Sequence, residues 1–391
     1  MKALKETFER DGQRVSRYLL RKIRYWRNYD WQEMALGCRH ALALRKLNPH
    51  TQTVLMVEPN RYHAEILPGY AHYFRQLGFD VVLLWRRQNA DSEVFDRVPL
   101  DERPVAYVMP PWLMRLFLKG RRNGKYNFIF ITSAIWAEPH GYFGTFCQYL
   151  GGCPKGRSGY AMVVHEFDHV VEAVKNGSVQ ISRISCLSPA ENHGKRIAMI
   201  NPHYFGEIKQ KPLAARRTFI TVGTQYRTFH KLIQIVRELE RHGWNNFRVQ
   251  IVGGGAIKAK YPEAPSNVEF LGRLGFPELY RRLESADFYL CVLDSAEPAH
   301  RRYLDATTSG ARQLILGFLK VPIIHEDFAR AFGLCPKSAI LYQSNKVLHA
   351  MTHALQMADA ERDNLRENLR RMCHKVAEAS LLDLRGQIET S

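Results

Sequence analysis

Short apolar stretches alternate with helix-like periodicity over most of the chain beyond residue 50. The segments 53–57, 79–85, 127–132 and 160–166 are rich in β-branched and aromatic residues, which is typical of buried strands. Between the first two, residues 63–78 have the apolar spacing of a helix that closes on a glycine. This βαβ rhythm predicts a parallel, doubly wound sheet with helices on its faces.

The same rhythm restarts after an irregular, basic stretch at 205–217, which we interpret as a linker. Strands are expected at 218–222, 247–253, 288–293 and 321–325, with helices at 229–243, 276–286 and 310–319. Two such domains in tandem place a cleft between the carboxyl ends of two sheets, where ligands of these folds bind. The expected fold class is therefore α/β, with two Rossmann-like domains facing a cleft.

The pattern divides the chain into a basic N-terminal segment (1–50), a first Rossmann-like domain (51–210), a second one (211–345) and a helical tail (346–391). On a helical wheel, apolar residues of the first segment face one side and five arginines face the other. This pattern fits a helix on an anionic membrane, and equally a helix packed on the protein. The apolar and basic stretch 110–122 fits docking on a membrane or binding of a lipid-linked acceptor, and equally an ordinary helix of the first domain.

The composition limits the binding partners and the cellular compartment that we expect for this protein. Lysine and arginine number 56 against 38 acidic residues, for a net charge of +18 that favours polyanions such as nucleic acid, anionic lipid or phosphorylated molecules. The seven scattered cysteines form no C-x-x-C pair, which argues against a disulfide framework or a zinc site. Because signal-peptide and membrane-spanning patterns are lacking, we expect a cytoplasmic protein, peripheral on the inner membrane face at most.

Residues 218–325 carry an ordered set of motifs. These are a first strand ending in glycine, a lysine in the following helix, a second strand ending "VGGG", and "FLGRL" before a short helix. In this order they resemble the donor domain of GT-B glycosyltransferases, family four in particular. The first domain is similar to that family more loosely, through "HAEILPGYAHYFRQLGFDVVLL". The resemblance implies a GT-B fold and transfer of a sugar from a nucleotide-sugar donor, with retention of the anomeric configuration.

The family also carries two glutamates separated by seven residues. Here Glu297 and Asp305 have that spacing, and Gly310 follows five residues later. The resemblance implies that Glu297 acts at the donor sugar and Asp305 at the ribose, since carboxylates accept bonds from hydroxyls. With Gly310, the residues Thr308 and Ser309 lie where a helix start offers N–H groups to a diphosphate. Simple helix capping would use the same residues.

Cationic groups should offset the donor diphosphate and stabilise it as it leaves. Lys231 matches the lysine of the family and is the main candidate; the alternative is that it only solvates a helix start. The family's arginine after Gly223 is replaced by Thr224, so Arg227 is a possible substitute. The resemblance adds Gly223 and Gly254 to the donor site. With no D-x-D pair and no metal-ligand spacing, no metal and no other cofactor is expected.

Three residues of the first domain complete the candidate site. His165 ends the strand at 160–166, and the resemblance implies that a histidine there touches the donor sugar. His63 and Glu65 lie in the first loop and suit binding of acceptor hydroxyls. A lone histidine is more often structural, which is the alternative for both.

We therefore expect a glycosyltransferase that acts on a glycan or lipid-linked acceptor in cell-surface polysaccharide or lipopolysaccharide assembly. A nucleotide-sugar epimerase of the same architecture, which needs no acceptor, is the first alternative. A nucleic-acid-binding protein, suggested by the charge, is the second, although no motif for RNA or DNA binding supports it. A dinucleotide-binding fingerprint is also missing after residues 53–57.

Overall fold

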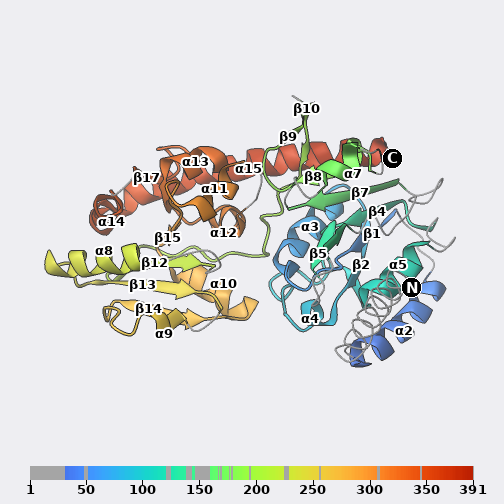
Figure 1. Cartoon of the computed structure of the whole chain (residues 1–391), viewed down its shortest axis with the longest axis horizontal. Helices are drawn as coiled ribbons and strands as arrows, with labels where there is room; N and C mark the ends of the chain where they lie inside the picture. Colours follow the sequence, from blue (N-terminus) through green and yellow to red (C-terminus); the bar gives the residue numbers. More distant parts are fainter. Residues whose placement is uncertain are drawn as a thin grey trace, which may run out of the picture.

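Figure 1 shows the computed structural model, in which two α/β domains lie side by side and the long helix α15 (Asp359–Glu389) runs along both. The structure describes residues 31–47, 52–119, 125–137, 143–145, 159–165, 167, 170–175, 177, 179–192, 195–223, 229–254, 257–305, 309–343 and 346–390. The basic helix expected at the very start of the chain lies outside these residues.

The first domain is built on a seven-stranded parallel sheet with the order β11-β8-β7-β4-β1-β2-β3. Its strands are β1 (Thr53–Val57), β2 (Asp80–Trp85), β3 (Val105–Val108), β4 (Phe128–Ile131), β7 (Gly159–Val164), β8 (Ile184–Cys186) and β11 (Ala198–Met199). Two small antiparallel pairs, β5 (Ile135–Ala137) with β6 (Phe143–Thr145) and β9 (Glu191–Asn192) with β10 (Lys195–Arg196), lie outside it. The four strands expected here from apolar runs are confirmed.

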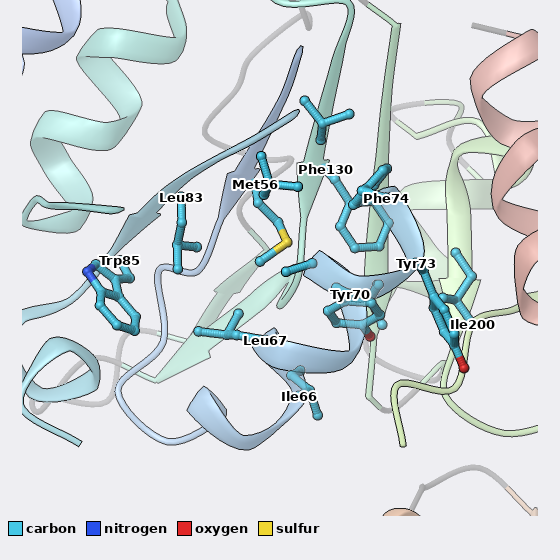
Figure 2. Close-up of a cluster of buried hydrophobic side chains, with 14 of the residues drawn as sticks. Met56, Ile66, Leu67, Tyr70, Tyr73, Phe74, Leu83, Trp85, Phe130 and Ile200 are labelled. Atoms are coloured by element: carbon cyan, nitrogen blue, oxygen red, sulfur yellow. The ribbon is translucent and has the colours of Figure 1, made fainter. Parts of the chain in front are cut away.

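Helices cover this sheet: α2 (Trp31–Lys46), the short η1 (Ala64–Ile66), α3 (Leu67–Gln76), α4 (Arg87–Ala90), α5 (Pro111–Lys119), α7 (Val171–Lys175) and η4 (Ile181–Arg183). Figure 2 shows how α3 lays Tyr70 and Phe74 against Phe130 of β4. The ring centroids of Tyr70 and Phe130 lie 5.0 Å apart, and those of Phe74 and Phe130 5.1 Å apart. Fully burying a side chain such as phenylalanine stabilises the folded state by about 1.5–3 kcal/mol. The packing fixes the loop that joins β1 to α3.

The second domain repeats the plan with a six-stranded parallel sheet of order β14-β13-β12-β15-β16-β17. Its strands are β12 (Arg217–Val222), β13 (Phe247–Val252), β14 (Val268–Gly272), β15 (Phe288–Leu290), β16 (Pro322–His325) and β17 (Ile340–Tyr342). Its helices are α8 (His230–Arg241), α9 (Ile257–Lys260), α10 (Phe276–Ser285), α11 (Pro298–Asp305), α12 (Gly310–Phe318), α13 (Glu326–Phe332) and α14 (Val347–Gln356). The strand order reverses between β12 and β15, which is where such sheets bind ligands.

The linker between the sheets packs on a glycine of each domain. An added Cβ on Gly69 of α3 would lie 2.7 Å from Pro202, and one on Gly317 of α12 would lie 2.4 Å from the Phe205 ring. The two glycines therefore let both helices approach the linker backbone closely. The tail is helical, as expected, and its Gln387 side chain donates to the Ile184 carbonyl of the first sheet at 3.1 Å.

The N-terminal part of the described chain belongs to the first domain. Helix α2 contacts both β3 and α5. Its Glu33 accepts two bonds from the Arg86 guanidinium, at 2.7 and 2.8 Å, in a buried pair. Among the described residues, no helix is both long enough and apolar enough to cross a membrane.

Candidate functional site

Four polar residues converge where strands of the first sheet end. Glu58 follows β1, Thr132 and Ser133 follow β4, and His165 follows β7. The Thr132 and Ser133 hydroxyls donate to Glu58 Oε2 at 2.8 and 2.9 Å. The backbone amide of Asn60 donates to Glu58 Oε1 at 2.6 Å. Because neighbouring parallel strands end at one edge, this convergence follows from the strand order. The result is a fully buried carboxyl group beneath the cleft.

Burial raises the pKa of Glu58 to about 7, although the nearby His63 and the three hydrogen bonds pull it down. The carboxyl group is therefore partly protonated near neutral pH. Sequence reasoning missed Glu58. The available signal was an acidic residue directly after the apolar run 54–57, where an acid is costly unless it is paired.

Two histidines lie above this carboxyl group. The ring centroids of His63 and His165 are 4.1 Å apart, and His63 Nδ1 lies 3.6 Å from Glu65 Oε1. Burial holds the pKa of His165 well below its usual range, so that ring is neutral. Burial also acts on His63, but contact with Glu65 and the charges of Glu65 and Glu58 outweigh it and raise its pKa. The two rings therefore differ in proton affinity although they touch.

His63, Glu65 and His165 line one wall of a cavity of about 350 Å³ between the domains. The opposite wall is formed by Gly223 at the end of β12 and by the start of α12. Ser309 caps that helix, its hydroxyl accepting from the Ala311 amide at 3.3 Å. Among the described residues, nothing lies within 4 Å of an added Cβ on Gly310, which leaves room for a ligand at that point of the helix start. The cavity is mostly apolar elsewhere, with Phe276, Leu279 and Tyr280 of α10 among its lining residues.

The cavity brings together half of the residues expected from the sequence: His63, Glu65, His165, Gly223, Ser309 and Gly310. Lys231 and Glu297 instead line a neighbouring cavity of about 440 Å³ in the second domain. There Lys231 Nζ donates to Asp294 Oδ2 at 2.6 Å. Asp294 was not expected from the sequence.

Of the four remaining expected residues, the structure describes only Gly254 in full. Gly254 is exposed just beyond β13, and Asp305 ends α11, its side chain lying outside the described part of the chain. Arg227 and Thr308 also lie outside the described residues. Within the residues that the structure describes, no group of three or more His, Cys, Asp or Glu side chains is placed to hold a metal ion.

No protein-family model and no curated protein matches the chain. Among solved structures, it is similar to the glycotransferase of kitacinnamycin, with 12% identity, a TM-score of 0.51, and coverage of 87% of this chain and 100% of that one. AviGT4, a glycosyltransferase involved in avilamycin A biosynthesis, gives 12% identity and a TM-score of 0.51, with 87% and 99% covered. The chain is also similar to Anabaena Alr3699/HepE in complex with UDP and glucose, with 12% identity and a TM-score of 0.50. The match covers 85% of this chain and 97% of that one.

At this level of identity the likeness establishes the fold, and it covers nearly the whole of each chain. The fold of this protein is GT-B: two parallel-sheet domains that face each other across a ligand-sized cavity. The expectation of fold class is confirmed.

Proposed function

We propose that the protein is a glycosyltransferase that moves a sugar from a nucleotide-sugar donor to a glycan or lipid-linked acceptor. The observation that carries this proposal is the cavity between the domains. One wall offers proton-accepting and hydroxyl-binding groups, His63 and Glu65, and the other offers the open start of α12. A transferase of this kind needs both, because it must hold a diphosphate and an acceptor hydroxyl on either side of one sugar.

The start of α12 is the proposed site of the donor diphosphate. The first N–H groups of a helix lack partners within the helix, and the helix dipole favours negative charge there. Gly310 leaves the approach open, and Gly223 has a φ of +91°, which lets the chain turn away from the end of β12. The HepE structure holds UDP and glucose. For this chain, a nucleoside diphosphate carrying a sugar is the ligand that we propose.

Lys231 and Glu297 keep the roles that the resemblance implies, as predictions. The Lys231 side chain is 70% exposed, so it can exchange Asp294 for a diphosphate without unfolding its surroundings. Asp294 has a lowered pKa: burial opposes ionisation, but the bond from Lys231, the bond from the Ala296 backbone amide and the charges of Lys231 and His325 together outweigh it. Exchange should therefore be easiest for a ligand with more than one negative charge. Asp305 at the ribose and Arg227 beside the diphosphate remain predictions of the same kind.

Cell-surface polysaccharide or lipopolysaccharide assembly at the inner membrane face is the setting that we propose. Exposed Trp31 and Leu42 of α2 and Leu116 of α5 support it, because the two helices contact each other and present these side chains to solvent. Arg45 and Lys46 in the last turn of α2 would complement anionic lipid. Catalysis without a metal ion is part of this proposal, and activity should then survive EDTA.

A panel of nucleotide sugars tests the donor. We expect at least one of UDP-glucose, UDP-galactose, UDP-N-acetylglucosamine, dTDP-glucose and GDP-mannose to raise the melting temperature at millimolar concentration. A ligand at 100 times its Kd stabilises a protein by about 2.7 kcal/mol. RNA and DNA oligonucleotides in physiological salt serve as the comparison. Stabilisation by nucleic acid and by none of the sugars would contradict the proposal.

The same panel separates transfer from epimerisation. An epimerase converts the donor to a second nucleotide sugar in the absence of any acceptor. A glycosyltransferase releases the nucleoside diphosphate, slowly to water and faster when an acceptor is present. Chromatography of the nucleotide products after overnight incubation distinguishes the two activities.

A further inference from the structure

Two side chains of the cavity between the domains carry buried polar atoms without a hydrogen-bond partner. Both amide atoms of Gln313, Nε2 and Oε1, lack a partner among the described residues, and so does the hydroxyl of Tyr280. The two side chains line the cavity, and the residues are 3% and 1% exposed. Resting on the proposed function, we infer that Gln313, helped by Tyr280, binds two adjacent hydroxyls of the donor and selects donors that carry them.

The unpaired atoms of Gln313 are a cost to the empty protein. Burial removes the water that would bond an amide, and no group of the described residues replaces it. Buried polar groups are normally paired, so an unpaired amide in a cavity wall needs a reason. A ligand that supplies both partners gives that reason. Such a site also discriminates, because an analogue without the hydroxyls leaves the buried groups unpaired.

The place of Gln313 on α12 puts it next to the proposed diphosphate site. Gly310 lies three residues before it and Gly317 four residues after it, so the three share one face of the helix. Gly310 leaves room at the helix start, and Gly317 packs against Phe205 of the linker. Long side chains of a helix lean back towards its first turn. The Gln313 side chain therefore extends towards the proposed diphosphate site.

Neighbouring contacts fix the rotation of α12 about its own axis. The Arg312 guanidinium donates to the Phe332 carbonyl of α13 and to the Leu187 carbonyl of the first domain, each at 3.2 Å. Arg312 is 4% exposed, so these bonds lie inside the protein. Because Gln313 is the next residue, the same contacts set the direction in which it leaves the helix. Its amide is nearly covered in the empty protein and meets a ligand by turning about its own side-chain bonds.

The chemistry of the two side chains suits a vicinal diol. One hydroxyl can donate to Gln313 Oε1 while its neighbour accepts from Nε2. Burial and the charge of Glu65 raise the pKa of Tyr280 well above its usual range, although Arg97 lowers it. The phenol therefore keeps its proton and can donate to a further oxygen. A nucleotide sugar carries such a diol on either side of its diphosphate, on the ribose and on the sugar.

The donor fits this pair of residues better than the acceptor does. Gln313 shares a helix with the proposed diphosphate site, whereas His63 and Glu65, proposed for the acceptor, line the opposite wall. Glu297, to which the resemblance gives the donor sugar, lines the other cavity. Gln313 and Tyr280 are therefore a separate point of contact with the hydroxyls of the donor.

The test replaces Gln313 by methionine, which is also unbranched and flexible but has no strong hydrogen-bonding atom. Isothermal titration calorimetry on the full chain measures the Kd of UDP and of UDP-glucose, or of the equivalent pair for the donor that the panel selects. We expect Gln313→Met to bind the probe that carries the diol about 10-fold more weakly, as the loss of two hydrogen bonds implies. The empty variant should melt at least about 1 °C above the parent, because two unpaired polar atoms are gone. A glutamine that only supports the fold would lower the melting temperature when replaced and leave the Kd unchanged.

The probes separate the two sources of the diol. A weaker Kd for UDP itself identifies the ribose, and the parent should then bind UDP more tightly than 2′-deoxy-UDP while the variant binds both alike. A normal Kd for UDP together with a weaker Kd for UDP-glucose identifies the sugar.

Two further variants complete the test. Tyr280→Phe removes only the hydroxyl and should weaken the same probe about 3-fold without lowering the melting temperature. Gln250→Met is the matched control. Gln250 is also a buried glutamine with an unpaired Oε1, but it lies in β13, lines neither cavity and donates from Nε2 to Glu269 at 2.8 Å. This variant should bind every probe as the parent does.

The outcomes are distinguishable. Parent-like Kd values for every probe in Gln313→Met, or in Tyr280→Phe should the first variant not fold, would overturn the inference and leave glycosyl transfer standing. An equal loss of affinity in Gln250→Met would do the same. Failure of every nucleotide sugar to bind or react would overturn the proposed function, and the inference with it.

Discussion

A single buried carboxyl group gives this protein its clearest dependence on pH. Glu58 has a pKa of about 7 in the folded chain, against an ordinary value of 4.5. The folded state therefore holds the proton more tightly than the unfolded chain does. The stability that this contributes is fully present below pH 4.5 and is lost as the pH rises through 7.

Glu58→Gln tests this. The variant cannot ionise, so its free energy of unfolding should change less than that of the parent between pH 5 and pH 8. The difference should approach roughly 3 kcal/mol, from a pKa shift of two to three units. Urea unfolding at four pH values within that range measures it. Parallel profiles for the two proteins would show that Glu58 ionises as easily in the folded state as in the unfolded chain.

At the residue scale, the sequence indicated those cavity residues that stand at or just after the end of a predicted strand. His63 and Glu65 stand in a loop after a strand, and His165 ends another strand, so strand order alone brings them to one edge. Glu58 was missed because its partners, Thr132 and Ser133, are more than seventy positions away in the chain. The acid directly after β1 was the only local signal, and no short-range spacing indicates which residues would pair with it. The Glu297 and Lys231 assignments rest on spacing, which does not indicate which of the two cavities a side chain lines.

Elements were predictable where apolar runs were long. The strands β1, β2, β12 and β13 are five or six residues long and largely buried, and their positions follow from the sequence. Strand β17, at Ile340–Tyr342, has only three residues. A run of three residues is too short to show an alternating pattern of apolar and polar positions. Its position in the sheet is set by the path of the chain between β16 and β17.

Helix α12 carries a glycine whose role is packing. An added Cβ on Gly317 would lie 2.4 Å from the Phe205 ring and 2.5 Å from the His203 carbonyl. Gly317→Ala should therefore destabilise the protein by about 1–3 kcal/mol, as overpacking does. Alanine is otherwise the better helix former by about 1 kcal/mol. The melting temperature measures the net effect.

Gly386→Ala is the matched control. Gly386 also lies inside a helix, α15, but nothing stands within 4 Å of its added Cβ. This variant should melt slightly above the parent, because only the helix propensity changes. Equal destabilisation by both substitutions would mean that contact with the linker is not what requires glycine at 317.

At the scale of the whole molecule, an ion pair crosses the boundary between the two domains. The Arg97 guanidinium of the first domain donates to both oxygens of Glu284 in α10, at 2.6 and 2.9 Å. Glu284 also accepts from the Lys209 amide of the linker at 2.8 Å. Burial would raise the pKa of Glu284. The bonds from Arg97 and the Lys209 amide, together with the charges of Arg97 and Lys320, outweigh burial and lower it.

Arg97→Met removes one partner of the pair and leaves the charge of Glu284 nearly buried without it. We expect a loss of about 3 kcal/mol in the free energy of unfolding, the scale found when a buried pair is broken on one side. The control is Arg237→Met, whose exposed pair with Glu263 spans 4.0 Å and should contribute under about 1 kcal/mol. Equal losses in the two variants, measured by urea unfolding, would argue against a structural role for the Arg97 pair.

The chain crosses between the domains twice, once in the linker after β11 and once in α15, which returns to lie along the first sheet. Because these two connections lie apart, we expect the two domains to move relative to each other mainly by rotation about the line through them, with the Arg97–Glu284 pair opposing that rotation. Twisting and sliding are resisted because either would stretch one of the ties. The gap between His63 and the start of α12 is then governed by a single angle. Any molecule that touches both walls fixes that angle, and with it the orientation of everything else along the cleft.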